Sequence, residues 1–178
     1  MTTRMKWTAT VLVLAIGLMA GTAAAQKGSD DIAAVGTFKG IQSSPGNCVT
    51  INEMCYGNTF VLKSHGEWES YHLTVSLNYS TSKFLPNNWV VSGGTWSMVV
   101  FRYDQYAGTL YGEVQSGNMS LVTNGNGDPV ARRMQANLTS QGGFGIFEGR
   151  AGRGISGAYD MIYELRSEET SGAANFNF

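Results

Sequence analysis

The stretch that decides the fold runs from Thr139 to Leu165 and reads TSQGGFGIFEGRAGRGISGAYDMIYEL. Glycines recur in it at positions 142, 143, 145, 149, 152, 154 and 157, with apolar or aromatic residues between them. A helix tolerates this composition badly, because each interior glycine costs about 1 kcal/mol relative to alanine. A strongly bent antiparallel hairpin tolerates it well, because glycine fills bulge positions and lets strands coil at a barrel corner.

Two segments alternate with the period of two that is typical of half-buried strands. At the end of the glycine-rich stretch, one face carries Ile155, Gly157, Tyr159, Met161, Tyr163 and Leu165. Within residues 67–79, one face carries Tyr71, Leu73, Val75, Leu77 and Tyr79. We expect Tyr71, Leu73, Val75, Leu77, Tyr159, Met161 and Tyr163 to face a common interior, because a closed barrel has only one.

Further strands are expected at residues 35–41, 58–63, 89–103, 109–115, 119–122 and 130–138, with a bend at Gly93-Gly94. Residues 80–88, 104–108 and 124–129 read as loops or turns. Short, evenly spaced strands, 23 glycines and no amphipathic helix outside the first 25 residues predict an all-β fold. The chain is expected to form a single antiparallel β-barrel of about eight strands, whose interior is filled by side chains or holds one small ligand.

The glycine-rich run resembles a motif of a known superfamily. Residues 142–154, GGFGIFEGRAGRG, are similar to the G-G-T-G-x-F-x-G-A-x-G-x-G run of the allene oxide cyclase and dirigent-like barrels, which are calycin-like, and especially of their secreted bacterial members. Phe144 replaces the usual threonine and Arg150 the usual alanine. The resemblance implies a barrel that steers a cyclisation or coupling, and it allows a homo-oligomer. The family's functional residues lie outside this run, and none is carried over.

The chain divides into four parts. Residues 1–25 carry Arg4 and Lys6, then a short apolar run, then Ala23-Ala24-Ala25, which is the pattern of a cleaved, bacterial-type secretory signal peptide. Residues 26–33 are expected to be a flexible leader, residues 34–166 the barrel domain, and residues 167–178 a polar C-terminal tail. The protein is therefore expected to be secreted or periplasmic.

Both cysteines, Cys48 and Cys55, lie in the exported part. An oxidising compartment and an even count favour a disulfide between them, whereas a two-cysteine metal site is disfavoured because neither histidine is close in sequence. No metal or cofactor site is expected.

The exported part carries 10 basic and 13 acidic residues, a net charge of −3, with no basic patch, so nucleic acid is not an expected partner. It also has no apolar stretch long enough for a helical membrane span after signal cleavage.

Two charged residues are candidates for a polar pocket or for the barrel rim. Arg132 shares a strand face with Val130, Met134 and Leu138, which is unusual for arginine. It is expected either to snorkel outward at the rim or to pair inside the barrel with a carboxylate such as Glu113.

The sequence leaves three functions open. The first is binding of a small hydrophobic ligand in a tyrosine-lined interior. The second is a cyclase-like or dirigent-like enzyme, which needs shape and few polar groups and so is not excluded by the missing catalytic motifs. The third is a structural or interaction protein with a filled barrel. Whether the protein is an enzyme is not decided at this level.

Overall fold

The computed structural model describes residues 36–49, 53–82, 85–149 and 156–177. The expected signal peptide and leader therefore lie outside the described residues, as does the glycine-motif segment from residue 150 to 155. The strands are β1 (Gly36–Ser44), β2 (Asn47–Val49), β3 (Met54–His65), β4 (Glu69–Ser82), β5 (Leu85–Arg102), β6 (Gln105–Thr123), β7 (Pro129–Gly145), β8 (Ser156–Glu164) and β9 (Glu169–Asn177). Among these described residues, no helix could cross a membrane.

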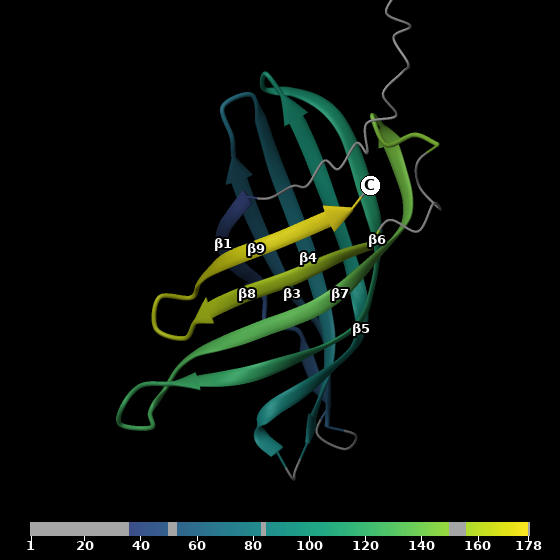
Figure 1. The fold of residues 1–178 in the computed structure, drawn as a ribbon. Coiled ribbons are helices and arrows are strands. Elements are labelled where there is room, and N and C mark those ends of the chain that lie inside the picture. Colours follow the sequence, from purple (N-terminus) through teal and green to yellow (C-terminus); the bar gives the residue numbers. More distant parts are fainter. Residues whose placement is uncertain (1–35, 50–52, 83–84, 150–155, 178) are drawn as a thin grey trace, which may run out of the picture.

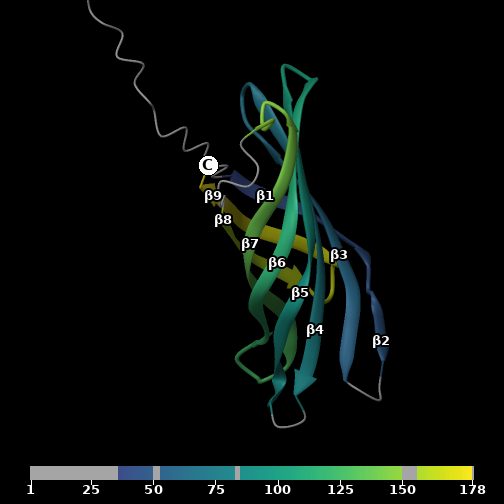
Figure 2. The same ribbon diagram turned by 90° about the vertical axis from the view of Figure 1, so that its right-hand side faces the viewer.

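The strands form one closed antiparallel barrel, as the sequence predicts. From β3 to β9 each strand pairs with the next, and β1 then pairs with both β9 and β3, so that eight strands close the barrel. The short β2 pairs antiparallel with the first residues of β3, Met54 to Tyr56. The long strands β4–β7 form one tall, bent wall, and β8 and β9 cross it at a steep angle on the other side (Figures 1 and 2).

The C-terminal segment differs from the expectation of a polar tail. It forms β9, which pairs with β8 and β1 and so closes the barrel. Thr170, Ala174 and Phe176 point inward from it and are 1%, 0% and 0% exposed. The sequence of this strand gives only a weak hydrophobic pattern, because alanine and glycine do not mark a buried face clearly. Their small size nevertheless suits a barrel wall that packs against large interior side chains.

The expected loops are also shorter in the structure. β4 runs to Ser82 and β5 begins at Leu85, so most of residues 80–88 is strand. Pro86 lies within an irregularity of the β4–β5 pairing, a position that suits a residue without an N–H to donate. The β5–β6 connection is a two-residue turn at Tyr103 and Asp104, and β6 is one continuous strand rather than two.

The predicted bend at Gly93-Gly94 is present. The β4–β5 register shifts next to it, between Asn78 and Tyr79, and both glycines have positive φ, of 152° and 142°. A residue with a side chain rarely adopts this conformation, so the glycine pair lets the long strand β5 curve around the core.

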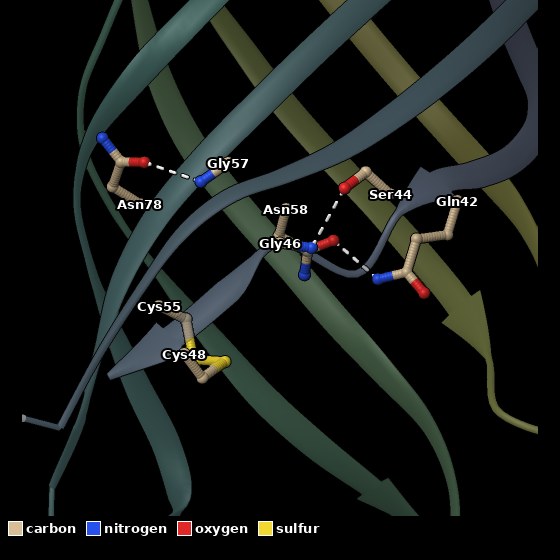
Figure 3. Close-up of a disulfide and its surroundings, with 8 residues drawn as sticks. All are labelled: Gln42, Ser44, Gly46, Cys48, Cys55, Gly57, Asn58 and Asn78. Carbon is tan, nitrogen blue, oxygen red and sulfur yellow. Dashed lines mark hydrogen bonds between the residues drawn. A yellow bond between two sulfur atoms is a disulfide. The ribbon is translucent and has the colours of Figure 1, made fainter. Parts of the chain in front are cut away.

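The disulfide joins β2 to β3, as the sequence predicts. Cys48 and Cys55 form a cross-strand pair with a Cα–Cα distance of 3.9 Å. Around it, the Asn78 side chain accepts a hydrogen bond from the Gly57 amide, and the Gln42 side chain donates one to Asn58 (Figure 3). The three residues of β2 are all exposed, so β2 is held to β3 by the antiparallel pairing and by this disulfide rather than by burial in the core.

We expect the double variant Cys48→Ser/Cys55→Ser to lose about 2–3 kcal/mol of unfolding free energy, because the bridge limits the unfolded chain. β2 should exchange its amide hydrogens faster, while the barrel stays folded. Chemical denaturation and hydrogen exchange measure the two effects, and non-reduced peptide mass spectrometry of the wild type checks that the bond is formed. An unchanged denaturation midpoint in the double variant would contradict the prediction.

Candidate functional site

The residues expected to share an interior do lie inside the barrel. Leu73, Val75, Leu77 and Met161 are 0% exposed, Tyr159 is 1% exposed and Tyr163 is 7% exposed. Tyr71 packs against the same core but is half-buried, because it lies near the barrel end and its hydroxyl bonds to Glu69. Burial and this carboxylate raise the pKa of Tyr71 to about 12, so its hydroxyl stays protonated at neutral pH.

The middle of the barrel is filled by side chains. An exposed fraction of 0% means that neither bulk solvent nor a water-sized void touches the side chain. Phe60, Leu62, Leu73, Met98, Leu110 and Phe147 all have this value and belong to one contiguous cluster. A ligand would therefore have to displace side chains to reach this part of the interior.

Polar groups enter the barrel at the end where β7 begins and β8 ends. Arg132 of β7 lies opposite Leu121 of β6 and Tyr163 of β8. Its guanidinium carbon lies 5.1 Å from the ring centroid of Trp89, which packs against the core from β5. We call this group, Trp89, Arg132 and Tyr163 together with Thr170 of β9, the Arg132 end of the barrel.

Arg132 is placed at the rim, which is one of the two expectations drawn from the sequence. Its side chain is half-buried, and its Nε is buried with no hydrogen-bond partner among the described residues. The guanidinium lies over the Trp89 ring, where a cation is attracted to the ring face. An acceptor from outside reaches this buried Nε only if the side chains around it move.

The charges around Tyr163 define the electrostatics of this end. Burial raises the pKa of Tyr163, the carboxylate of Glu168 raises it further, and Arg132 lowers it. The phenol is therefore influenced by a cation and an anion at the same barrel end, and it remains a neutral donor at physiological pH.

Three buried hydroxyls lack hydrogen-bond partners among the described residues, and two of them, those of Thr170 and Tyr159, lie on the closing strands β9 and β8. Thr170 lies opposite Tyr163, and its Oγ1 is buried and unpaired. Tyr159 lies deeper, and its buried hydroxyl is also unpaired. Burial raises the pKa of Tyr159 well above its usual range, so this group is not an acid or base at physiological pH.

Glu113 does not join Arg132. It lies on the outer face of β6, exposed, where Gln115 donates a hydrogen bond to it over 3.4 Å. The inward-facing residues on this part of β6 are Leu110, Gly112 and Val114, so the strand period places Glu113 on the opposite side. The expected alternative of an interior Glu113–Arg132 pair is therefore wrong.

Sequence reasoning missed Trp89 and Thr170 as members of this site. Trp89 stands in a segment whose alternation was interrupted by the Gly93-Gly94 bend, so its face could not be read from Trp96 and Met98. Thr170 fell in the segment taken for a tail.

Comparison with known proteins adds no further identification, since no family model, curated protein or solved structure matches the chain.

Proposed function

We propose that this chain is an exported binding barrel that takes a small, mostly apolar ligand carrying a hydrogen-bond acceptor at the Arg132 end. The observation that carries this proposal is the buried Arg132 Nε without a partner, beside the face of Trp89. A carboxylate or carbonyl oxygen of a ligand would accept from this donor, and its apolar body would lie on Trp89 and the adjacent core.

The energetic argument rests on the cost of an unpaired buried donor. Leaving such a group without an acceptor costs about 1–3 kcal/mol, and a hydrogen bond to a charged group contributes about 1.5–3 kcal/mol. Binding of a ligand that supplies an acceptor is therefore favoured, because it removes the cost of the unpaired donor. The buried, unpaired hydroxyl of Thr170 lies on the next strand but one and offers a second donor.

Export is part of the same proposal. The bond between Cys48 and Cys55 is stable in an oxidising compartment, and the first 25 residues have the pattern of a secretory signal. Both features support the proposal that the protein binds its ligand outside the cytoplasm.

The filled middle of the barrel favours a second candidate, a structural or interaction protein that binds no small molecule. Its support is the set of interior side chains with 0% exposure. In that case Arg132 only covers the barrel end.

The cyclase-like or dirigent-like enzyme ranks third. It rests on the resemblance of the glycine-rich run. An acid–base pair inside the barrel would favour it, but Glu113 points to the opposite side of the wall from Arg132.

The test compares a fluorescent long-chain fatty acid with its methyl ester. The wild type is expected to bind the acid about tenfold or more tightly than the ester, because only the acid offers an anionic acceptor to Arg132. Arg132→Met should remove this preference while keeping an apolar stem. Titration of the probe fluorescence measures each dissociation constant.

The neighbouring residue offers a matched control. Arg133 lies on the outer face of the same strand and pairs with Asp160, with its Nη2 2.6 Å from Oδ2. Arg133→Met removes the same charge from the protein and should leave the preference intact. Binding of neither probe by the wild type would contradict the proposal and support the filled, structural barrel.

A further inference from the structure

The opposite end of the barrel carries an aromatic cleft. It lies between the β3–β4 loop and the β5–β6 turn and has a volume of about 320 Å³, within the usual range for small-ligand sites. Its lining residues include His65, Glu67, Trp68, Glu69, Tyr103 and Asp104. Trp68 and Tyr103 are 59% and 72% exposed, which is unusual for such large aromatic residues.

The two rings are held in a defined arrangement. Their centroids are 5.6 Å apart and their planes are inclined by 51°, so they form a corner rather than a flat platform. The backbone fixes both loops, because the Tyr103 amide donates a 3.0 Å hydrogen bond to the Trp68 carbonyl. Tyr103 and Asp104 both have positive φ, as in the tight turns that join paired strands. The cleft is therefore largely preorganised.

The charge of this cleft is negative. Glu69 is neutralised by Arg102, whose Nε lies 2.7 Å from its Oε1. In the part of the chain that the structure describes, no basic side chain forms an ion pair with Glu67 or Asp104. Two uncompensated carboxylates thus stand beside two exposed aromatic rings.

We propose that this cleft binds a small organic cation with an alkylated ammonium group. Tryptophan and tyrosine faces attract cations through their quadrupoles, and nearby carboxylates add a Coulomb attraction that a neutral ligand of the same shape lacks. A sugar would instead be expected to stack on a flat aromatic surface. This site is separate from the Arg132 end and does not depend on the function proposed there.

The test uses three probes: choline, its uncharged carbon isostere 3,3-dimethylbutan-1-ol, and the neutral saccharide maltotriose. Binding of each probe is measured by NMR chemical shifts of the wild-type protein. Choline is expected to shift the Trp68 indole and Tyr103 resonances and to bind at least about fivefold more tightly than the isostere. Added salt should weaken this binding, because the carboxylates are exposed.

Variants locate the site. Trp68→Ala should weaken choline binding about fivefold or more, and Glu67→Gln or Asp104→Asn about twofold to threefold each. Asparagine suits position 104 because it tolerates the positive φ of 61°. Phe144→Ala is the matched control, since Phe144 is also 59% exposed but lies outside the cleft. Thermal melts verify that each variant is folded.

Four results would overturn the proposal. Equal binding of choline and its isostere would mean that the cleft recognises apolar shape and not charge. Binding of maltotriose alone would identify a saccharide site. Failure of choline to shift any cleft resonance at tens of millimolar, or equal weakening by Phe144→Ala, would remove the cleft as a cation site.

Discussion

Gly112→Ala is expected to lower the melting temperature of this protein by about 10 °C, the largest effect that we predict for a single methyl group. Gly112 of β6 is buried and lies opposite Ser140 of β7. A Cβ atom at this position would stand 1.8 Å from the carbonyl oxygen of Thr139 and 2.8 Å from the Cα of Ser140. Both atoms belong to the backbone, so the two strands would have to separate.

The same carbonyl oxygen has a second role. The indole Nε1 of Trp96 donates a 3.0 Å hydrogen bond to it, and the Trp96 ring lies against Phe176 of the closing strand, with centroids 4.9 Å apart. Displacing Thr139 would weaken this hydrogen bond and disturb the contact with β9. Overpacking costs about 1–3 kcal/mol and a lost buried hydrogen bond about 1–3 kcal/mol, so the total is roughly 2–6 kcal/mol.

Gly125→Ala is the control for this prediction. Gly125 lies in the β6–β7 turn, where no atom lies within 4 Å of an added Cβ and its φ is not in the left-handed region. The melting temperature of the Gly125→Ala variant should stay within about 1 °C of that of the wild type. Calorimetry of both variants compares them directly, and equal melting temperatures would show that the walls at Gly112 can move apart at little cost.

Leu73 is expected to tolerate neither a smaller nor a larger side chain. It is 0% exposed and lies between Leu62 of β3 and Met98 of β5 in the cross-strand pairing. Leu73→Ala should cost about 2–5 kcal/mol, because it removes buried methyl groups and leaves a cavity. Leu73→Trp should cost about 1–3 kcal/mol, because a filled interior must be forced apart to hold the larger ring.

The two variants are informative together because Leu73→Ala removes side-chain volume from the interior and Leu73→Trp adds it. In an open interior cavity, tryptophan would find room, and Leu73→Trp would melt like the wild type. Denaturant unfolding measures both costs, and Val90→Ala, at a residue that is 57% exposed, should stay within about 0.5 kcal/mol of the wild type. A wild-type midpoint for Leu73→Trp would contradict the filled interior and favour a ligand pocket in the middle of the barrel.

Local patterns in the sequence were enough to predict the barrel and its inner faces. The alternation along residues 67–79 and 155–165 has a period of two because successive strand residues point to opposite faces, so Leu73 and Met161 could be placed inside before any pairing was known. The glycine pair at 93 and 94 and the two cysteines are likewise local signals, because a bend and a short disulfide loop involve neighbours in the chain.

Only the tertiary structure decided how the barrel closes and what its two ends carry. The segment after residue 166 has no marked hydrophobic pattern, and it becomes β9 because the gap between β8 and β1 offers its amides partners and its Phe176 a core to enter. Trp89 meets Arg132, and Trp68 meets Tyr103, across strands or loops that lie far apart in the sequence. Such contacts depend on register and closure, which arise from the pairing of all strands together, and no local stretch of the chain contains that information.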